Sequence, residues 1–167
     1  MARDTETEMT AFEARKVDLE RSIFARMFRA SHAARKQGQK ILQQISGLSV
    51  VEWRIIWDLH EVGPLRISEL AELIGIDRSL VSRALPAMEK AGLVTLTRGA
   101  SDARQVIVRL TDAGEDRYAQ CTAAMGRRRA DAQKAFTAEE LDLFLSFLDR
   151  FEVVVDQPPE LYSRIRE

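Results

Sequence analysis

The chain has 167 residues, of which 25 are basic and 26 acidic, so its net charge is −1 at pH 7. With 46% hydrophobic residues it can build one compact core, which excludes a disordered chain. It has one cysteine, no apolar signal segment near its start and no uncharged apolar run near the ~20 residues that span a bilayer. We therefore expect a cytoplasmic protein with neither a membrane span nor an internal disulfide.

The first predicted element is one long helix over residues 10–45, with Gly38 as a plausible bend because it is the only glycine there. Apolar residues recur on one face at helical spacing: Leu19, Ile23, Met27, Ala30 and Ala34. We interpret residues 1–46 as an N-terminal dimerisation helix.

A second helix is predicted from Ser49, which forms an S-x-x-E capping box with Glu52, to about residue 60. Gly63 and Pro64 close this helix. The two tryptophans of the chain, Trp53 and Trp57, lie four residues apart in it and therefore share one helical face.

Two short helices joined by a tight turn follow. Gly75 accepts the positive φ that ends the first helix, which places its last residue at Ile74. Asp77 is the expected N-cap of the second helix, which begins near Arg78. This arrangement is typical of a helix-turn-helix.

The second helix of this pair has one apolar and one polar face. Val81, Leu85 and Met88 recur at i, i+4 and i+7 and are expected in the core. Ser79, Ser82 and Arg83 then lie opposite, where arginine can donate two hydrogen bonds to guanine and serine can bond bases or phosphate. The alternative is a solvated helix face.

A β-hairpin with a basic tip is predicted next. Apolar and polar residues alternate over 94–97 and over 106–110, on either side of a polar loop at 99–103. Arg98 and Arg104 extend from this hairpin, and Asp102 can orient Arg104. Such a wing can enter a narrow minor groove. The alternative is a surface ion pair of little energetic value.

The helix-turn-helix and hairpin segment is basic although the net charge of the whole chain is negative, and this favours binding to a polyanion. Residues 77–109 contain six basic and three acidic side chains, hence a charge of +3. DNA affinity depends on the field at the contact surface and not on the total charge of the protein.

Two further helices are predicted over 112–136 and 138–155, with Thr111 and Thr137 as N-caps. The last helix is apolar around most of its circumference, so a short chain cannot bury it alone. We expect a homodimer. Its two recognition helices, the helices that begin near Arg78 in each chain, would lie about one DNA turn, ~34 Å, apart and select an inverted repeat. The alternative is an intramolecular core helix.

About two-fifths of the chain resembles the MarR family of bacterial transcriptional regulators. The matching segments are GLSVVEWRIIWDL (47–59), SELAELIGIDRSLVSRAL, MEKAGLV and SDARQVIVRLTDAG, which ends at residue 114. The resemblance implies a homodimer with one winged module per subunit, a recognition helix around residues 79–83 in the major groove and the wing arginine of a D-x-R pattern, Arg104, in the minor groove. It also implies ligand-sensitive repression or activation of nearby genes.

The chain departs from the family pattern at three positions. Leu96 stands where a basic residue is frequent, and Ala103 stands inside the D-x-R pattern where arginine is common. Pro86 lies inside the recognition helix, where it cannot bond to the carbonyl of Ser82 and is expected to kink the helix.

The predicted fold class is mainly α with a small β-hairpin wing: a winged helix-turn-helix plus a helical dimerisation region. The predicted parts are the N-terminal helix (1–46), the DNA-binding domain (47–111), the C-terminal dimerisation helices (112–156) and a tail (157–167), packed as one intertwined unit. The partners are double-stranded DNA, a second copy and a small-molecule effector, with no membrane. The DNA-binding candidates are Arg78, Ser79, Ser82, Arg83, Arg98, Asp102 and Arg104.

The predicted function is repression at a palindromic operator, relieved by a small aromatic or phenolic ligand. Five apolar side chains are candidates for binding that ligand: Phe24, Met27, Phe28, Trp53 and Trp57. Binding there would shift the separation of the recognition helices and hence the affinity for DNA.

Other chemistry has little support in the sequence. His32 and His60 lack neighbours at metal-ligand spacing, and no catalytic constellation occurs, so we expect no metal, no cofactor and no enzyme activity. Two alternatives stay open: a redox-sensing DNA-binding regulator acting through Cys121, and a winged-helix adaptor that binds protein and not DNA.

Overall fold

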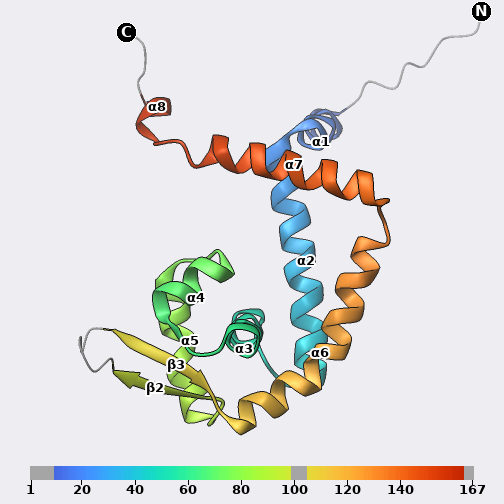
Figure 1. Ribbon diagram of the computed structural model, residues 1–167. Helices are drawn as coiled ribbons and strands as arrows, with labels where there is room; N and C mark the ends of the chain where they lie inside the picture. The colour runs from blue at the N-terminus through green and yellow to red at the C-terminus, as the bar shows by residue number, and fades with distance from the viewer. Residues whose placement is uncertain (1–9, 99–104, 164–167) are drawn as a thin grey trace, which may run out of the picture. The chain divides into compact units, whose positions relative to one another are not determined.

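The computed structural model describes residues 10–98 and 105–163, which form eight helices and three strands (Figure 1). Packing divides the chain into two units, residues 1–122 and 123–167, with the boundary inside one helix. The elements are α1 (Ala11–Arg21), α2 (Ile23–Ile45), α3 (Val50–Val62), β1 (Leu65–Arg66), α4 (Ile67–Ile74), α5 (Arg78–Lys90), β2 (Val94–Arg98), β3 (Val106–Leu110), α6 (Asp112–Gln133), α7 (Ala138–Val155) and α8 (Glu160–Ser163). The predicted fold class, mainly helical with a small antiparallel sheet, is confirmed.

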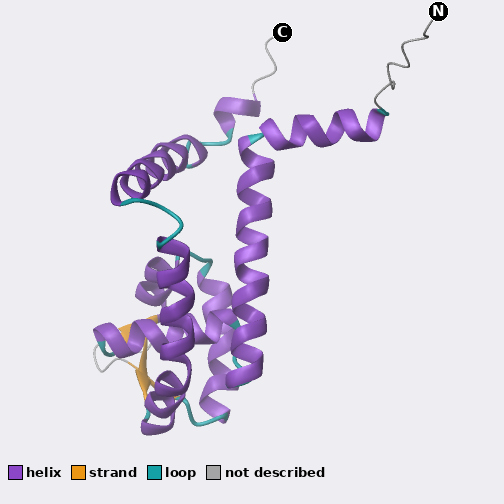
Figure 2. Cartoon of the chain, turned by 90° about the vertical axis from the view of Figure 1, so that its right-hand side faces the viewer, coloured by secondary structure: helices purple, strands orange, loops and turns teal. Residues whose placement is uncertain are grey.

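The N-terminal segment is two helices, so the prediction of one long helix bending at Gly38 was wrong. The break is at Ser22, whose extended backbone (ψ 118°) ends α1 and whose hydroxyl accepts a hydrogen bond from the amide of Ala25 as the N-cap of α2. Figure 2 shows the first helix from the N-terminal end turning away from the axis of the long helix that follows it. Gly38 lies buried inside the uninterrupted α2.

Helix α3 is the centre of the first unit and contacts α2, α4 and α5. The predicted capping box begins it: the amide of Glu52 donates to Ser49 Oγ (3.2 Å), and the amide of Ser49 donates to Glu52 Oε2 (2.7 Å). Its inward side chains form much of the core, namely Trp53, Ile55, Ile56 and Leu59. In Figure 1, α3 lies between α2 and the α4–α5 pair.

The helix-turn-helix forms where it was predicted. Helix α4 ends at Ile74, and Gly75 adopts the left-handed conformation (φ 71°) that a side chain would strain. Asp77 occupies the N-cap position of α5, but the expected side-chain cap is absent: its backbone carbonyl, and not its carboxylate, accepts a hydrogen bond from the amide of Leu80 (2.9 Å).

The sheet has three antiparallel strands in the order β1-β3-β2, one strand more than predicted. The hairpin pairs Val94 with Leu110 and Leu96 with Val108. The two-residue strand β1 adds Leu65 opposite Val108 on the other edge of β3. Two residues carry too little periodicity to be recognised as a strand from sequence.

Helix α6 begins against the hairpin. Thr111 Oγ1 accepts a hydrogen bond from the amide of Gly114 (3.1 Å) and donates to the carbonyl oxygen of Gly92 (2.6 Å), which joins the helix start to the base of β2. The helix ends at Gln133, three residues before the predicted end.

In the second unit, α7 has the predicted bounds and the predicted N-cap at Thr137, which forms a capping box with Glu140. None of its residues is buried. Its exposed apolar side chains are Leu143, Phe144, Leu145, Phe147, Val153, Val154 and Val155. Over the ranges that the structure describes, every helix is too short or too polar to cross a bilayer.

Candidate nucleic-acid interface

Helix α5 presents the polar face that the sequence predicts. Val81, Leu85 and Met88 are buried and attach the helix to the core. Four candidate DNA-binding side chains are exposed on its other surface: Arg78, Ser79, Ser82 and Arg83. Because the apolar residues hold the helix rigidly, these side chains are offered to solvent on a preorganised element.

Pro86 does not interrupt α5, which continues from Arg78 to Lys90. The ring is exposed, away from the core-facing residues. Pro86 has no N–H to donate to the carbonyl of Ser82, so that carbonyl loses its helical donor near the centre of the polar face.

The hairpin is attached to the recognition helix by a hydrogen bond. The amide of Leu96 on β2 donates to Glu89 Oε1 of α5 (3.3 Å). Arg98 is exposed at the end of β2, the end from which the loop departs. Asp102 and Arg104, the predicted D-x-R pair of the wing, lie outside the described residues. The structure thus joins the helix to the base of the wing.

A second constellation of polar and aromatic residues lies where α3 meets α6. The rings of Trp53 and Tyr118 are stacked with centroids 5.7 Å apart, and the rings of Tyr118 and His60 are 3.6 Å apart. Glu61 Oε1 accepts hydrogen bonds from Trp57 Nε1 (3.2 Å) and from the hydroxyl of Tyr118 (3.4 Å). Tyr118 is not among the residues predicted from the sequence, because nothing local indicates that α6 passes α3.

His60 joins the same two helices. Its Nδ1 lies 2.7 Å from Glu115 Oε2, within hydrogen-bonding distance. We name the residues at this junction the aromatic cluster: Trp53, Trp57, His60, Glu61, Glu115 and Tyr118. The cluster connects α3 to α6, and α3 in turn contacts both helices of the helix-turn-helix, α4 and α5.

The five candidate ligand-binding residues do not gather at one place within a chain. Trp53 is 2% exposed, whereas Phe28 is 74% exposed and stacks on His32. Helix α2 meets the start of α3 at Gln39, which bonds the backbone of Leu48 and Val50. Phe28 precedes Gln39 by eleven residues, ~16 Å along the helix, and Phe24 and Met27 lie farther still. The helix length therefore separates the phenylalanines from Trp53.

Three polar atoms on α3 are buried without a hydrogen-bond partner in the described chain: Trp53 Nε1, Arg54 Nε and Asp58 Oδ2. Burial raises the pKa of the Asp58 carboxyl above its usual value, and the nearby Arg54 guanidinium opposes this effect only in part. The ionised form of Asp58 is therefore less stable in the folded protein than in the unfolded chain.

We expect an Asp58→Asn substitution to increase the free energy of unfolding at pH 7. The carboxyl of Asp58 ionises near pH ~3.9 in the unfolded chain and at a higher pH in the folded protein. The stability of the wild type therefore falls as the pH rises from the unfolded pKa through the folded pKa. Below the unfolded pKa the carboxyl is protonated in both states and its burial carries no such cost. Urea unfolding at pH 7 and at pH 3.5 measures both values. A difference between variant and wild type that persists unchanged at pH 3.5 would contradict this assignment.

Cys121 is fully buried on α6, with its Sγ 3.2 Å from Ser46 Oγ. The oxidation of a thiol requires access to the oxidant and a thiolate. This placement does not favour the redox alternative.

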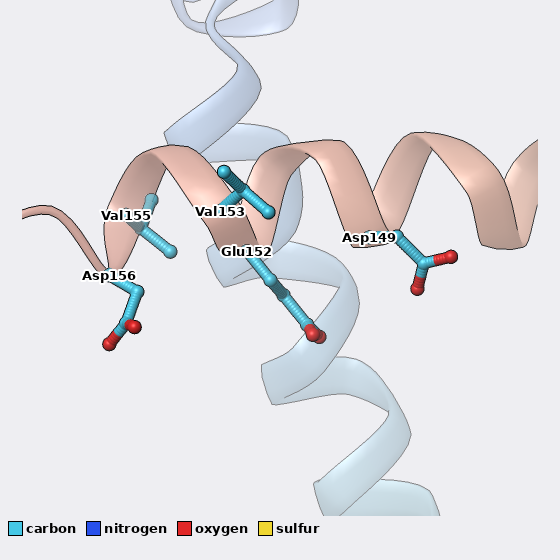
Figure 3. Close-up of a pocket in the computed structure, with 5 residues that line it drawn as sticks. All are labelled: Asp149, Glu152, Val153, Val155 and Asp156. Atoms are coloured by element: carbon cyan, nitrogen blue, oxygen red, sulfur yellow. The ribbon is translucent and has the colours of Figure 1, made fainter.

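The carboxylates of α7 extend together from one side of the helix, as Figure 3 shows for Asp149, Glu152 and Asp156. With Val153 and Val155 they line a shallow depression of about 520 Å³. Three carboxylates repel an anionic ligand, so this depression does not suit an aromatic acid. No group of three His, Cys, Asp or Glu side chains suited to a metal ion occurs in residues 10–98 and 105–163.

Comparison with known proteins places this geometry among DNA-binding regulators. The model of the MarR family matches residues 48–106. NadR, solved in complex with 4-hydroxyphenylacetate, is 30% identical; the match covers 78% of this chain and 92% of NadR, with a TM-score of 0.64. The residues matched by the family model include α3 to β2.

Two solved proteins from Streptomyces coelicolor share the fold at lower identity. Sco3205, a MarR family transcriptional regulator in complex with DNA, is 24% identical over 95% of this chain and 96% of its own, with a TM-score of 0.71. The PcaV transcriptional regulator, in complex with its natural ligand, is 18% identical over 83% of this chain and 96% of its own, with a TM-score of 0.70.

Proposed function

This chain belongs to the MarR family of transcriptional regulators, and from that membership we propose that it is a homodimeric repressor that binds a palindromic operator and is released by a small aromatic acid. Proteins of this family are DNA-binding regulators without enzymatic activity. A cytoplasmic location is part of the proposal, because the operator is there.

The observation that carries the DNA-binding proposal is the rigid polar face of α5. Ser79, Ser82 and Arg83 are exposed on a helix whose opposite face is buried, which is the geometry by which a recognition helix enters the major groove. We assign Arg83 to a guanine edge and Arg78, Ser79 and Ser82 to neighbouring bases or phosphates. Arg98, Asp102 and Arg104 are assigned to the wing and the minor groove.

The dimer proposal is supported by apolar surface that one chain leaves exposed on helices of both units. On α1 and α2 this surface comprises Phe12, Val17, Ile23, Phe24 and Phe28, and on α7 it includes Leu143 and Phe147. Exposed apolar surface on this scale is typical of a protein interface. A two-fold dimer presents two recognition helices and therefore favours an inverted repeat.

The function is tested by selecting operators from random DNA with the purified protein. We expect an enriched inverted repeat, bound far more tightly than scrambled DNA, with an affinity that falls steeply as salt rises. Light scattering of the same material should give twice the chain mass of 18.9 kDa. A monomer, or equal affinity for selected and scrambled DNA, would refute the proposal.

We place the effector beside the aromatic cluster. Trp53 Nε1 is a buried donor with no acceptor in the described residues, and an unmet donor of this kind is stabilised by a carboxylate or phenol oxygen. The cluster also joins α3 to α6, and α3 packs against α4 and α5, so a ligand bound there would shift α6 relative to the helix-turn-helix that α3 supports. The relative NadR was solved with 4-hydroxyphenylacetate, which is therefore the first compound to try.

The proposed effector site predicts that substitution of Trp53 weakens ligand binding and that substitution of Trp57 does not. Both tryptophans of the chain belong to the aromatic cluster, so intrinsic fluorescence reports binding of 4-hydroxyphenylacetate directly. We expect Trp53→Phe to weaken binding about 10- to 150-fold, which corresponds to the loss of ~1.5 to 3 kcal/mol for a hydrogen bond to a charged group. Trp57→Phe is the matched control, since its indole N–H already donates to Glu61. Equal losses in both variants would contradict the role of Trp53 Nε1.

A further inference from the structure

One apolar side chain stands exposed beside the polar face of α5. Leu80 is 37% exposed and lies in the first turn of the helix, next to Ser79. Its backbone is already engaged, because its amide donates to the carbonyl of Asp77. What the first turn offers to a partner at this position is therefore the leucine side chain alone.

Leu80 belongs to an apolar edge of the outward surface. Ala87 follows seven residues later, two turns along the helix, and is also exposed, so the two lie on the same edge. Arg83 lies three residues from Leu80 and therefore adjacent to it on the helix surface. The opposite side is occupied by Val81 and Leu85, both buried. Leu80 is therefore not one of the apolar residues that pack this helix into the core.

The chemistry of the major groove restricts what such an edge can recognise. Each base pair presents hydrogen-bond donors and acceptors there, and the only apolar group is the C5 methyl of thymine. A leucine has no donor or acceptor, so it can discriminate among bases only by packing on that methyl. Residues in the first turns of a recognition helix are the ones that reach the base edges.

We propose that Leu80 is a specificity-determining residue that contacts a thymine methyl in each half-site, beside the base bound by Arg83. This inference rests on the proposed function, since it requires that α5 enter the major groove. It assigns the operator a required thymine at one position per half-site, which the polar residues of α5 do not demand.

Replacement of thymine by deoxyuridine removes the methyl and changes no hydrogen-bonding group. The selected operator is therefore prepared with each thymine replaced in turn, and the affinity of the full-length protein is measured at one fixed salt concentration. We expect a loss of about fourfold for each contacted methyl, the value for burying one such group, at one symmetric pair of positions. Leu80→Ala should bind the thymine and uracil operators equally at that pair.

Two further variants separate this contact from a general effect on the fold. Leu80→Met keeps apolar reach and should retain the sensitivity to uracil. Leu73→Ala removes another exposed leucine, 49% exposed on α4, and should respond to uracil as the wild type does. If Leu80→Ala loses affinity at uracil positions as the wild type does, or if the wild type is insensitive at every thymine, the inference is overturned. If the wild type does not distinguish selected from scrambled DNA, the proposed function itself fails.

Discussion

An Arg83→Ala substitution is expected to lose ~1 to 3 kcal/mol of operator binding free energy for each half-site and to relax the preference at one base pair. A two-fold dimer makes this contact once in each half-site, so the binding free energy of the dimer falls by twice this amount. Arg83 is exposed and has no ion pair among the described residues, so its guanidinium is available to donate two hydrogen bonds to guanine. Fluorescence anisotropy with the selected operator and with variants of each base pair measures the effect.

The matched control is Arg109→Ala, which removes an exposed arginine from β3 of the same module. The loss of affinity in Arg109→Ala should be small and equal on operator and scrambled DNA, because this substitution reduces the positive electrostatic potential and removes no contact to a base. The thermal unfolding of Arg83→Ala should match that of the wild type. An unaltered base preference in Arg83→Ala would contradict base recognition by this residue.

A Gly114→Ala substitution is expected to lower the free energy of unfolding. A Cβ at residue 114 would meet the backbone carbonyl oxygen of Leu93 and would lie 2.6 Å from Leu110 Cδ1. The carbonyl cannot rotate away, because it accepts a hydrogen bond from the amide of Thr111. Overpacking of this kind costs ~1 to 3 kcal/mol, occasionally more. Chemical denaturation of the full-length protein measures the loss in free energy of unfolding.

Gly126→Ala provides the control on the same helix. A Cβ at residue 126 meets no atom of the described structure within 4 Å, and alanine is favoured over glycine in a helix by ~0.5 to 1 kcal/mol. We therefore expect opposite signs for two identical substitutions in α6. Equal changes in the free energy of unfolding would show that the start of α6 does not approach Leu93 as closely as described.

The sequence predicts best where a conformation depends on a few neighbouring residues. The capping boxes at Ser49 and Thr137 satisfy amides three residues away, and both formed. Gly75 adopts the positive φ expected of it because the turn requires a conformation that side chains disfavour. Val81 and Leu85 are buried because their spacing puts them on one helical face. Each of these signals lies within one or two helical turns.

The errors arose where two local outcomes have similar energy. Serine occurs both inside helices and at N-caps, and the conformation at Ser22 settled on the cap, while Gly38 remained helical. The Asp77 carboxylate accepts no first-turn amide although it occupies the N-cap position. Strand β1 exists only because β3 offers Leu65 an edge to pair with.

The amino-acid sequence alone determined the helix-turn-helix, the exposed serine–arginine face of α5 and the hairpin, because helix caps, a glycine turn and residue periodicity act through neighbours. Only the tertiary structure decided that Tyr118 stacks on Trp53, that α2 carries Phe28 away from them, and that Gly114 lies against Leu93. Contacts between distant segments depend on how whole helices pack, and that packing is a property of the complete core.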